Sequence, residues 1–124
     1  MQKPRPKHLD LIRIRLPLPG IVSILHRVSG AALFLSLGFL LYLFQASLAA
    51  PEGFAAFKGL VAQPLVKLVL IGLLWAFLHH LCAGIRYFAL DLDFGTDLAP
   101  ARTSSTAVLV VSIVLTVVLG VKLW

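Results

Sequence analysis

Three long uncharged stretches dominate the hydropathy pattern of this chain. Residues 28–50 carry no formal charge over 23 positions, and residues 103–121 carry none over 19. Residues 68–85 are uncharged over 18 positions when their two histidines are counted as neutral. A 23-residue helix rises about 35 Å, which exceeds the roughly 30 Å hydrocarbon core of a bilayer. The pattern predicts three transmembrane helices.

The flanking prolines, glycines and charges set the predicted boundaries. A basic, proline-interrupted segment precedes the first helix, and the connections 51–63 and 91–102 are expected to be loops too short for a separate domain. We therefore predict an all-α membrane protein with a single membrane-anchor domain over residues 1–124. Its expected parts are a cytoplasmic basic segment over 1–20 and helices over 21–50, 64–90 and 103–122.

The composition agrees with a lipid environment. Hydrophobic residues make up 60% of the chain and charged residues 13%, against about 25% charged in an average soluble domain. The net charge of +6 could suggest nucleic-acid binding, but five of the 11 basic residues lie within the first fifteen positions. No basic stripe interleaved with aromatic residues accompanies them, so the cluster is typical of a membrane flank.

The distribution of Lys and Arg predicts the orientation. With a cytoplasmic N-terminus, that side holds six basic residues and the opposite side three, namely Lys58, Lys67 and Lys122. Short loops on the cytoplasmic side are enriched in Lys and Arg. We expect a bacterial inner-membrane protein with a cytoplasmic N-terminus and a periplasmic C-terminus, although an organelle-encoded or already processed chain would show the same pattern.

Polar residues inside the predicted spans are the candidates for function, because ionisable groups in a bilayer are costly. They form two groups, which antiparallel helices would bring to the same side of the membrane. The first group opens helix 21–50 and the second closes helix 64–90: Ser23, His26 and Arg27, and then His79, His80, Arg86 and Asp91.

His80 is the candidate cofactor ligand. It lies eleven residues before Asp91, about 16 Å below the membrane boundary, and Gly84 one turn later leaves room for a flat, bulky group. A neutral imidazole at this depth suits the axial ligation of haem iron, with the propionates extending toward a layer that holds Arg27 and Arg86. The alternative is a histidine that hydrogen-bonds to a neighbouring helix.

The other two histidines of the predicted spans are weaker ligand candidates. The rise per residue places His26 about 9 Å nearer the surface than His80. A second axial ligand is therefore expected from another subunit. His79 points about 100° away from His80 around the helix, so we expect it to contact a partner subunit or to lie next to the ligating residue without binding the metal itself.

Ser23 and Arg27 stand one turn apart just below the predicted cytoplasmic boundary. A quinone presents two carbonyl oxygens to hydrogen-bond donors while its tail remains in lipid, and a fixed cation stabilises the negative charge that develops on reduction. The alternative is that Arg27 extends to lipid phosphate and Ser23 bonds to its own helix.

Two motifs resemble those of a known family. Residues 23–30 read S-I-L-H-R-V-S-G and match the pattern S-x-x-H-R-x-[ST]-G. Residues 80–86 read H-L-C-A-G-I-R and match H-x-x-x-G-x-R with a downstream aspartate at Asp91. Both are similar to the signatures of the cytochrome b membrane-anchor subunit of succinate dehydrogenase, respiratory complex II. The early Arg5-Pro6 and the stretch 47–54 extend the similarity over nearly the whole chain.

The resemblance implies a role for each candidate residue. His80 matches the axial ligand of haem b, and Ser23 and Arg27 match residues of the quinone site. His26 and Arg27 match contacts to the haem propionates, in the layer where Arg86 is also expected. Asp91 matches an acid that would hold Arg27 by charge pairing. One departure is Tyr87, which stands where many relatives have histidine.

The resemblance also implies cofactors and partners. A second hydrophobic anchor subunit would supply the other haem ligand, and iron–sulfur and flavoprotein subunits would carry electrons from succinate to ubiquinone or menaquinone. The chain would be a non-flavin subunit of succinate:quinone oxidoreductase, not catalytic alone. The alternatives are the anchor of a fumarate reductase and a cofactor-free structural or transport subunit.

Overall fold

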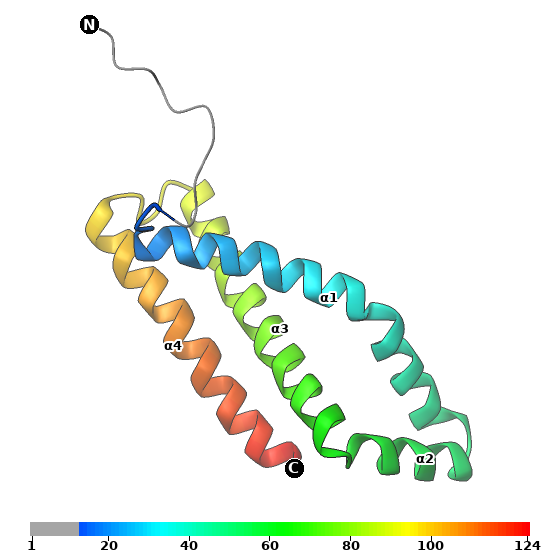
Figure 1. Cartoon of the computed structure of the whole chain (residues 1–124). Helices are drawn as coiled ribbons and strands as arrows, with labels where there is room; N and C mark the ends of the chain where they lie inside the picture. The colour runs from blue at the N-terminus through cyan, green and yellow to red at the C-terminus, as the bar shows by residue number, and fades with distance from the viewer. Residues whose placement is uncertain (1–12) are drawn as a thin grey trace, which may run out of the picture.

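The computed structural model describes residues 13–124 as four helices (Figure 1). They are α1 (Leu18–Ala49), α2 (Pro51–Val61), α3 (Pro64–Asp91) and α4 (Leu98–Leu123). The three longest are apolar and long enough to cross a membrane, which confirms the prediction of an all-α membrane bundle. The basic residues Lys3, Arg5 and Lys7 and the Arg5-Pro6 pair lie outside the described residues.

The connection 51–63 is not the loop that we expected, because most of it forms α2. Pro51 occupies the first turn of this helix, where proline is favoured since its missing N–H would have no partner there. Glu52 lies in the first turn and Lys58 in the last, and both charges complement the helix dipole. Two further boundaries differ from the prediction, since α1 begins at Leu18 and α4 at Leu98.

The buried core is small and lies among α1, α3 and α4. It is centred on one apolar residue from each of these helices, Val22, Ala83 and Val108. Most of the large apolar side chains point outward instead, as shown by Leu35, which is 82% exposed. Such an apolar exterior is stable only in lipid.

Small polar residues line the buried side of α4. Ser105, Ser112 and Thr116 are buried, and each hydroxyl donates to a carbonyl three or four residues earlier in its own helix. These side chains satisfy their polar atoms locally and occupy little volume. They therefore allow close packing between spans, as small residues do in membrane bundles.

The packing of α1 against α3 changes along the bundle (Figure 1). The first half of α1 crosses the second half of α3, where Gly30 meets His80. Toward α2 the two helices diverge, while α4 follows α3. We call the first region the crossing and the second the wedge. The crossing contains the polar residues singled out in the sequence.

Candidate functional site

The crossing depends on a glycine in α1. A Cβ atom added at Gly30 would lie 2.8 Å from Cε1 of His80, so no larger residue fits without displacing the imidazole. A Cβ atom at Gly84 would lie 3.8 Å from Nε2 of His26, which is an ordinary contact. Gly84, which we expected to leave room beside His80, lines a cavity there, while Gly30 is the glycine that the contact between α1 and His80 requires.

The rings of His26 and His80 stack against each other. Their centroids are 4.1 Å apart and their planes differ by 9°. The expected difference in depth of about 9 Å is therefore wrong, because α1 crosses α3 at an angle and begins three residues earlier than predicted. Two stacked, parallel rings cannot place nitrogens on opposite sides of one iron atom. His26 and His80 therefore do not form a bis-histidine site, and the reason is their stacking, not the difference in depth that we expected.

Hydrogen bonds fix the ring of His80. Its Nδ1 lies 3.0 Å from the carbonyl oxygen of His26 and 3.2 Å from Oγ of Ser29. The Ser29 hydroxyl donates to the same carbonyl at 2.9 Å. Because a carbonyl only accepts, the short contact places the proton on Nδ1 and leaves the lone pair on Nε2. A backbone carbonyl often orients a metal-ligating histidine in this way.

A cavity of about 390 Å³ lies beside His80. It is lined from α3 alone by His80, Leu81, Gly84, Ile85 and Phe88, and all of these except the histidine are apolar or glycine. No group of three or more His, Cys, Asp or Glu side chains converges anywhere in residues 13–124. The site therefore offers one imidazole ligand beside an apolar surface, which fits a haem better than a metal held by protein ligands alone.

Ser23 and Arg27 share one side of α1 at spacing i, i+4. Ser23 is half-buried and Arg27 is exposed. Across residues 13–124, neither side chain makes a hydrogen bond or an ion pair, so the expected alternative of a serine bonded to its own helix is not observed. Both donors are available to a ligand from outside the chain.

Arg86 faces α4. Its Nε donates to Oγ of Ser104 at 2.9 Å and its Nη2 to the Ala101 carbonyl at 3.3 Å. The side chain is buried, and its guanidinium lies 5.4 Å from the ring centroid of Tyr87. These partners lie on α4, and a contact of Arg86 with a haem propionate remains a prediction.

Asp91 ends α3 and is exposed. In the part of the chain that the structure describes, it forms no ion pair with Arg27. The expected charge pairing is therefore not observed among residues 13–124, where both side chains are exposed. Any role of Asp91 toward a cofactor remains a prediction.

His79 belongs to the interior of the chain. It is fully buried beside the backbone of Val22, and its ring stacks on Trp75 with centroids 5.2 Å apart. Neither ring nitrogen has a hydrogen-bond partner among residues 13–124. The expectation of a partner contact is wrong for this histidine, because α1 and α4 cover its side of α3.

The sequence did not reveal the contacts of three further residues of the crossing. Ser29 and Gly30 end the first motif, where their presence was the only signal of a role. The hydroxyl of Tyr87 is buried with no hydrogen-bond partner in the described residues, and its ring lies 5.1 Å from that of His26. Tyr87 therefore adds a donor beside the two stacked histidines.

Comparisons with known proteins point to one family. Residues 1–119 match the family described as the succinate dehydrogenase/fumarate reductase transmembrane subunit. A protein of Coxiella burnetii named succinate dehydrogenase cytochrome b556 subunit is 38% identical over the full length of both chains. A protein of the same name from Paracoccus denitrificans is 34% identical over 93% of this chain and 87% of its own length. Another, from Rickettsia felis, is 28% identical over 97% of this chain and 92% of its own.

Proposed function

This chain belongs to the succinate dehydrogenase/fumarate reductase transmembrane subunit family, and we propose that it binds haem b through His80 and quinone through Ser23 and Arg27. Family membership already makes it a membrane subunit of an oxidoreductase complex. The proposal adds which residues bind haem and which bind quinone. The observation that carries it is the hydrogen bond from Nδ1 of His80 to the His26 carbonyl.

The haem role follows from the fixed tautomer of His80. With the proton on Nδ1, Nε2 is available as a neutral nitrogen ligand, and the hydrogen bond orients the ring. Haem supplies a one-electron redox centre when it is bound. Gly84 and the apolar residues of the cavity give the ring space beside His80. A further ligand would come from a second anchor subunit, because the ring of His26 is stacked on that of His80 and is not positioned as a second ligand.

The quinone role rests on two unengaged donors in α1. The Ser23 hydroxyl can donate to a quinone carbonyl oxygen, and the charge of Arg27 stabilises the negative charge that develops on reduction. The exposed position of Arg27 leaves it open to a substrate that arrives from lipid or from a partner interface. We propose that His26 and Arg27 would also contact the haem propionates, and the ring of Tyr87 lies 5.1 Å from that of His26.

The partners follow from the same assignment. The chain acts with an iron–sulfur subunit and a flavoprotein subunit, which oxidise succinate outside the membrane and deliver electrons to the crossing. It is not catalytic alone. The crossing lies on the cytoplasmic side of a bacterial inner membrane, in agreement with the excess of Lys and Arg on that side. The family also includes fumarate reductase subunits, but the relatives named above are all succinate dehydrogenase subunits.

The haem assignment is tested by the reduced-minus-oxidised spectrum of the purified complex. His80→Ala removes the b-type band, whereas His26→Asn keeps it, because the backbone carbonyl and not the ring of His26 holds His80. Size-exclusion chromatography checks that both variants remain assembled. A b-type band that survives His80→Ala in an assembled complex would overturn the ligand assignment. The assignment would also be overturned if the band were lost in the His26→Asn variant but not in the His80→Ala variant.

The quinone assignment is tested with two electron acceptors. Arg27→Ala lowers succinate-driven quinone reduction by about tenfold or more, since a hydrogen bond to a charged group contributes about 1.5–3 kcal/mol. Reduction of a soluble dye by the other subunits is unchanged. Arg15→Ala, an exposed arginine at the same end of the chain, is the control. Equal loss with both acceptors would contradict a quinone role for Arg27.

A further inference from the structure

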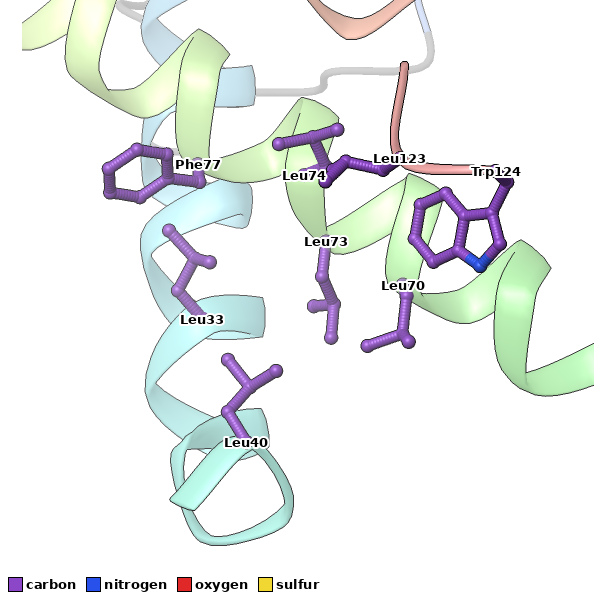
Figure 2. A pocket seen from close by; sticks show the side chains of 8 residues that line it. All are labelled: Leu33, Leu40, Leu70, Leu73, Leu74, Phe77, Leu123 and Trp124. Carbon is purple, nitrogen blue, oxygen red and sulfur yellow. The ribbon is translucent and has the colours of Figure 1, made fainter. Parts of the chain in front are cut away.

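The wedge contains an apolar cavity of about 300 Å³, which begins about one helical turn from the crossing (Figure 2). Leu33 and Leu40 of α1 point into it, opposite Leu73 of α3, and Trp124 closes one side. Every residue that lines it is leucine, phenylalanine or tryptophan. The cavity therefore presents no polar side-chain partner to an occupant except the indole N–H of Trp124.

A second cavity of about 370 Å³ adjoins the first. The two share Leu70, Leu123 and Trp124, and the second reaches α2 through Phe57 and Val61. Together they form an apolar space from the middle of α1 and α3 to the end of the bundle that carries α2. We call this space the wedge cavity.

The linking helix explains why the wedge stays open. Packed helices lie about 8–10 Å apart. The 11 residues of α2 rise about 16 Å, and this rigid segment separates the end of α1 from the start of α3. Gly53 of α2 already packs against α1, because a Cβ atom there would lie 3.1 Å from the Ala46 carbonyl oxygen. The wedge therefore cannot close by a simple tilt of α1.

The end of the bundle that carries α2 has an excess of positive charge. Within residues 13–124, the end of the bundle that carries α2 has three cations, Lys58, Lys67 and Lys122, and one acid, Glu52. Nζ of Lys67 lies 5.9 Å from the ring centroid of Trp124, which itself lines the cavity. Paired Lys and Trp side chains are typical of the level of lipid headgroups.

We propose that the wedge cavity binds an acyl chain of an anionic phospholipid whose phosphate lies against Lys67. An acyl chain matches a narrow space with apolar walls, and the phosphate matches the excess of cations at its mouth. This site is separate from the haem and quinone residues and does not depend on their assignment.

The test counts phospholipids retained by the purified complex, using native mass spectrometry after exchange into micelles that contain phosphatidylglycerol or phosphatidylcholine. Leu73→Trp fills the cavity from α3, and Leu40→Trp fills it from α1. Each is expected to retain one phosphatidylglycerol fewer than the parent complex. Leu35→Trp, at a position that is 82% exposed, is the matched control and retains the full number.

Lys67→Gln tests the headgroup. The parent complex retains phosphatidylglycerol at least several-fold better than phosphatidylcholine, and this preference is lost in the variant. Unchanged lipid counts in both tryptophan variants would overturn the proposal. So would equal retention of the two lipids by the parent complex, or a disulfide between Leu73→Cys and a cysteine of another subunit, since a polypeptide would then fill the space.

Discussion

The crossing and the wedge are built from the same two helices but pack in opposite ways. At the crossing, Gly30 allows His80 to lie against the backbone of α1, and hydrogen bonds through Ser29 and the His26 carbonyl join the two helices. In the wedge, α1 and α3 face each other with leucines and lie apart (Figure 2). The contact between α1 and α3 is therefore close-packed in the polar region and open in the apolar region.

This difference follows from the solvent. In water, facing leucines would drive two helices together, but lipid tails solvate leucine as well as another helix does. Small residues and interhelical hydrogen bonds therefore determine where membrane helices touch. The polar crossing fixes the position of the ligand, and the apolar wedge is left for lipid. A substitution in one region should therefore leave the other region intact.

The largest effect is expected from Gly30→Leu. The first side-chain atom would already lie 2.8 Å from His80, so α1 must move or the imidazole must leave its position. Overpacking of this kind costs about 1–3 kcal/mol or more. We expect the b-type absorbance per complex to fall by about tenfold, together with a lower melting temperature.

Gly38→Leu is the matched control on the same helix. No atom outside its own turn lies within 4 Å of a Cβ atom at Gly38, so the new side chain enters open space. The complex should keep its haem absorbance and its melting temperature. If the two variants behave alike, close packing at the crossing does not position His80.

An intermediate effect is expected from Arg86→Met. The variant loses the hydrogen bonds to Ser104 and to the Ala101 carbonyl, which join α3 to α4. Hydrogen bonds to a charged group contribute about 1.5–3 kcal/mol, so the melting temperature of the complex should fall while the haem spectrum is unchanged. Arg102→Met removes an exposed arginine nearby and should change stability by less than about 0.5 kcal/mol.

The same variant decides between two roles of Arg86. If the guanidinium instead holds a haem propionate, Arg86→Met shifts the midpoint potential of the haem and leaves the melting temperature unchanged. The structure favours the first outcome, since two of the guanidinium nitrogens already have partners on α4.

The sequence was sufficient to predict the three spans, because an uncharged run of about 20 residues is long enough to cross a bilayer and is rare in water-soluble domains. It was insufficient for α2, since an 11-residue helix at the membrane boundary is too short and too mixed in polarity to differ from a loop. Its proline start and its terminal charges were visible in the sequence, but their meaning depends on knowing that a helix is present.

The site was predicted in part. The motifs singled out His80 and Arg27, but the arithmetic of rise per residue assumed helices parallel to the membrane normal and therefore separated His26 from His80. The inclined crossing depends on Gly30, whose neighbour is 50 residues away in sequence. The partners of Arg86 on α4 were hidden for the same reason, because spacing within one helix does not determine which helix covers each side.

The smallest effect concerns the corner where α2 meets α1. Alanine is favoured over glycine inside a helix by about 0.5–1 kcal/mol. Gly59→Ala should gain this stabilisation, because a Cβ atom there meets nothing within 4 Å. Gly53→Ala should gain none, because its Cβ atom would lie 3.1 Å from the Ala46 carbonyl oxygen and would displace α2. The melting temperatures of the two variants measure the difference. A higher melting temperature for both would mean that the corner tolerates movement, and then α2 would not hold the wedge open.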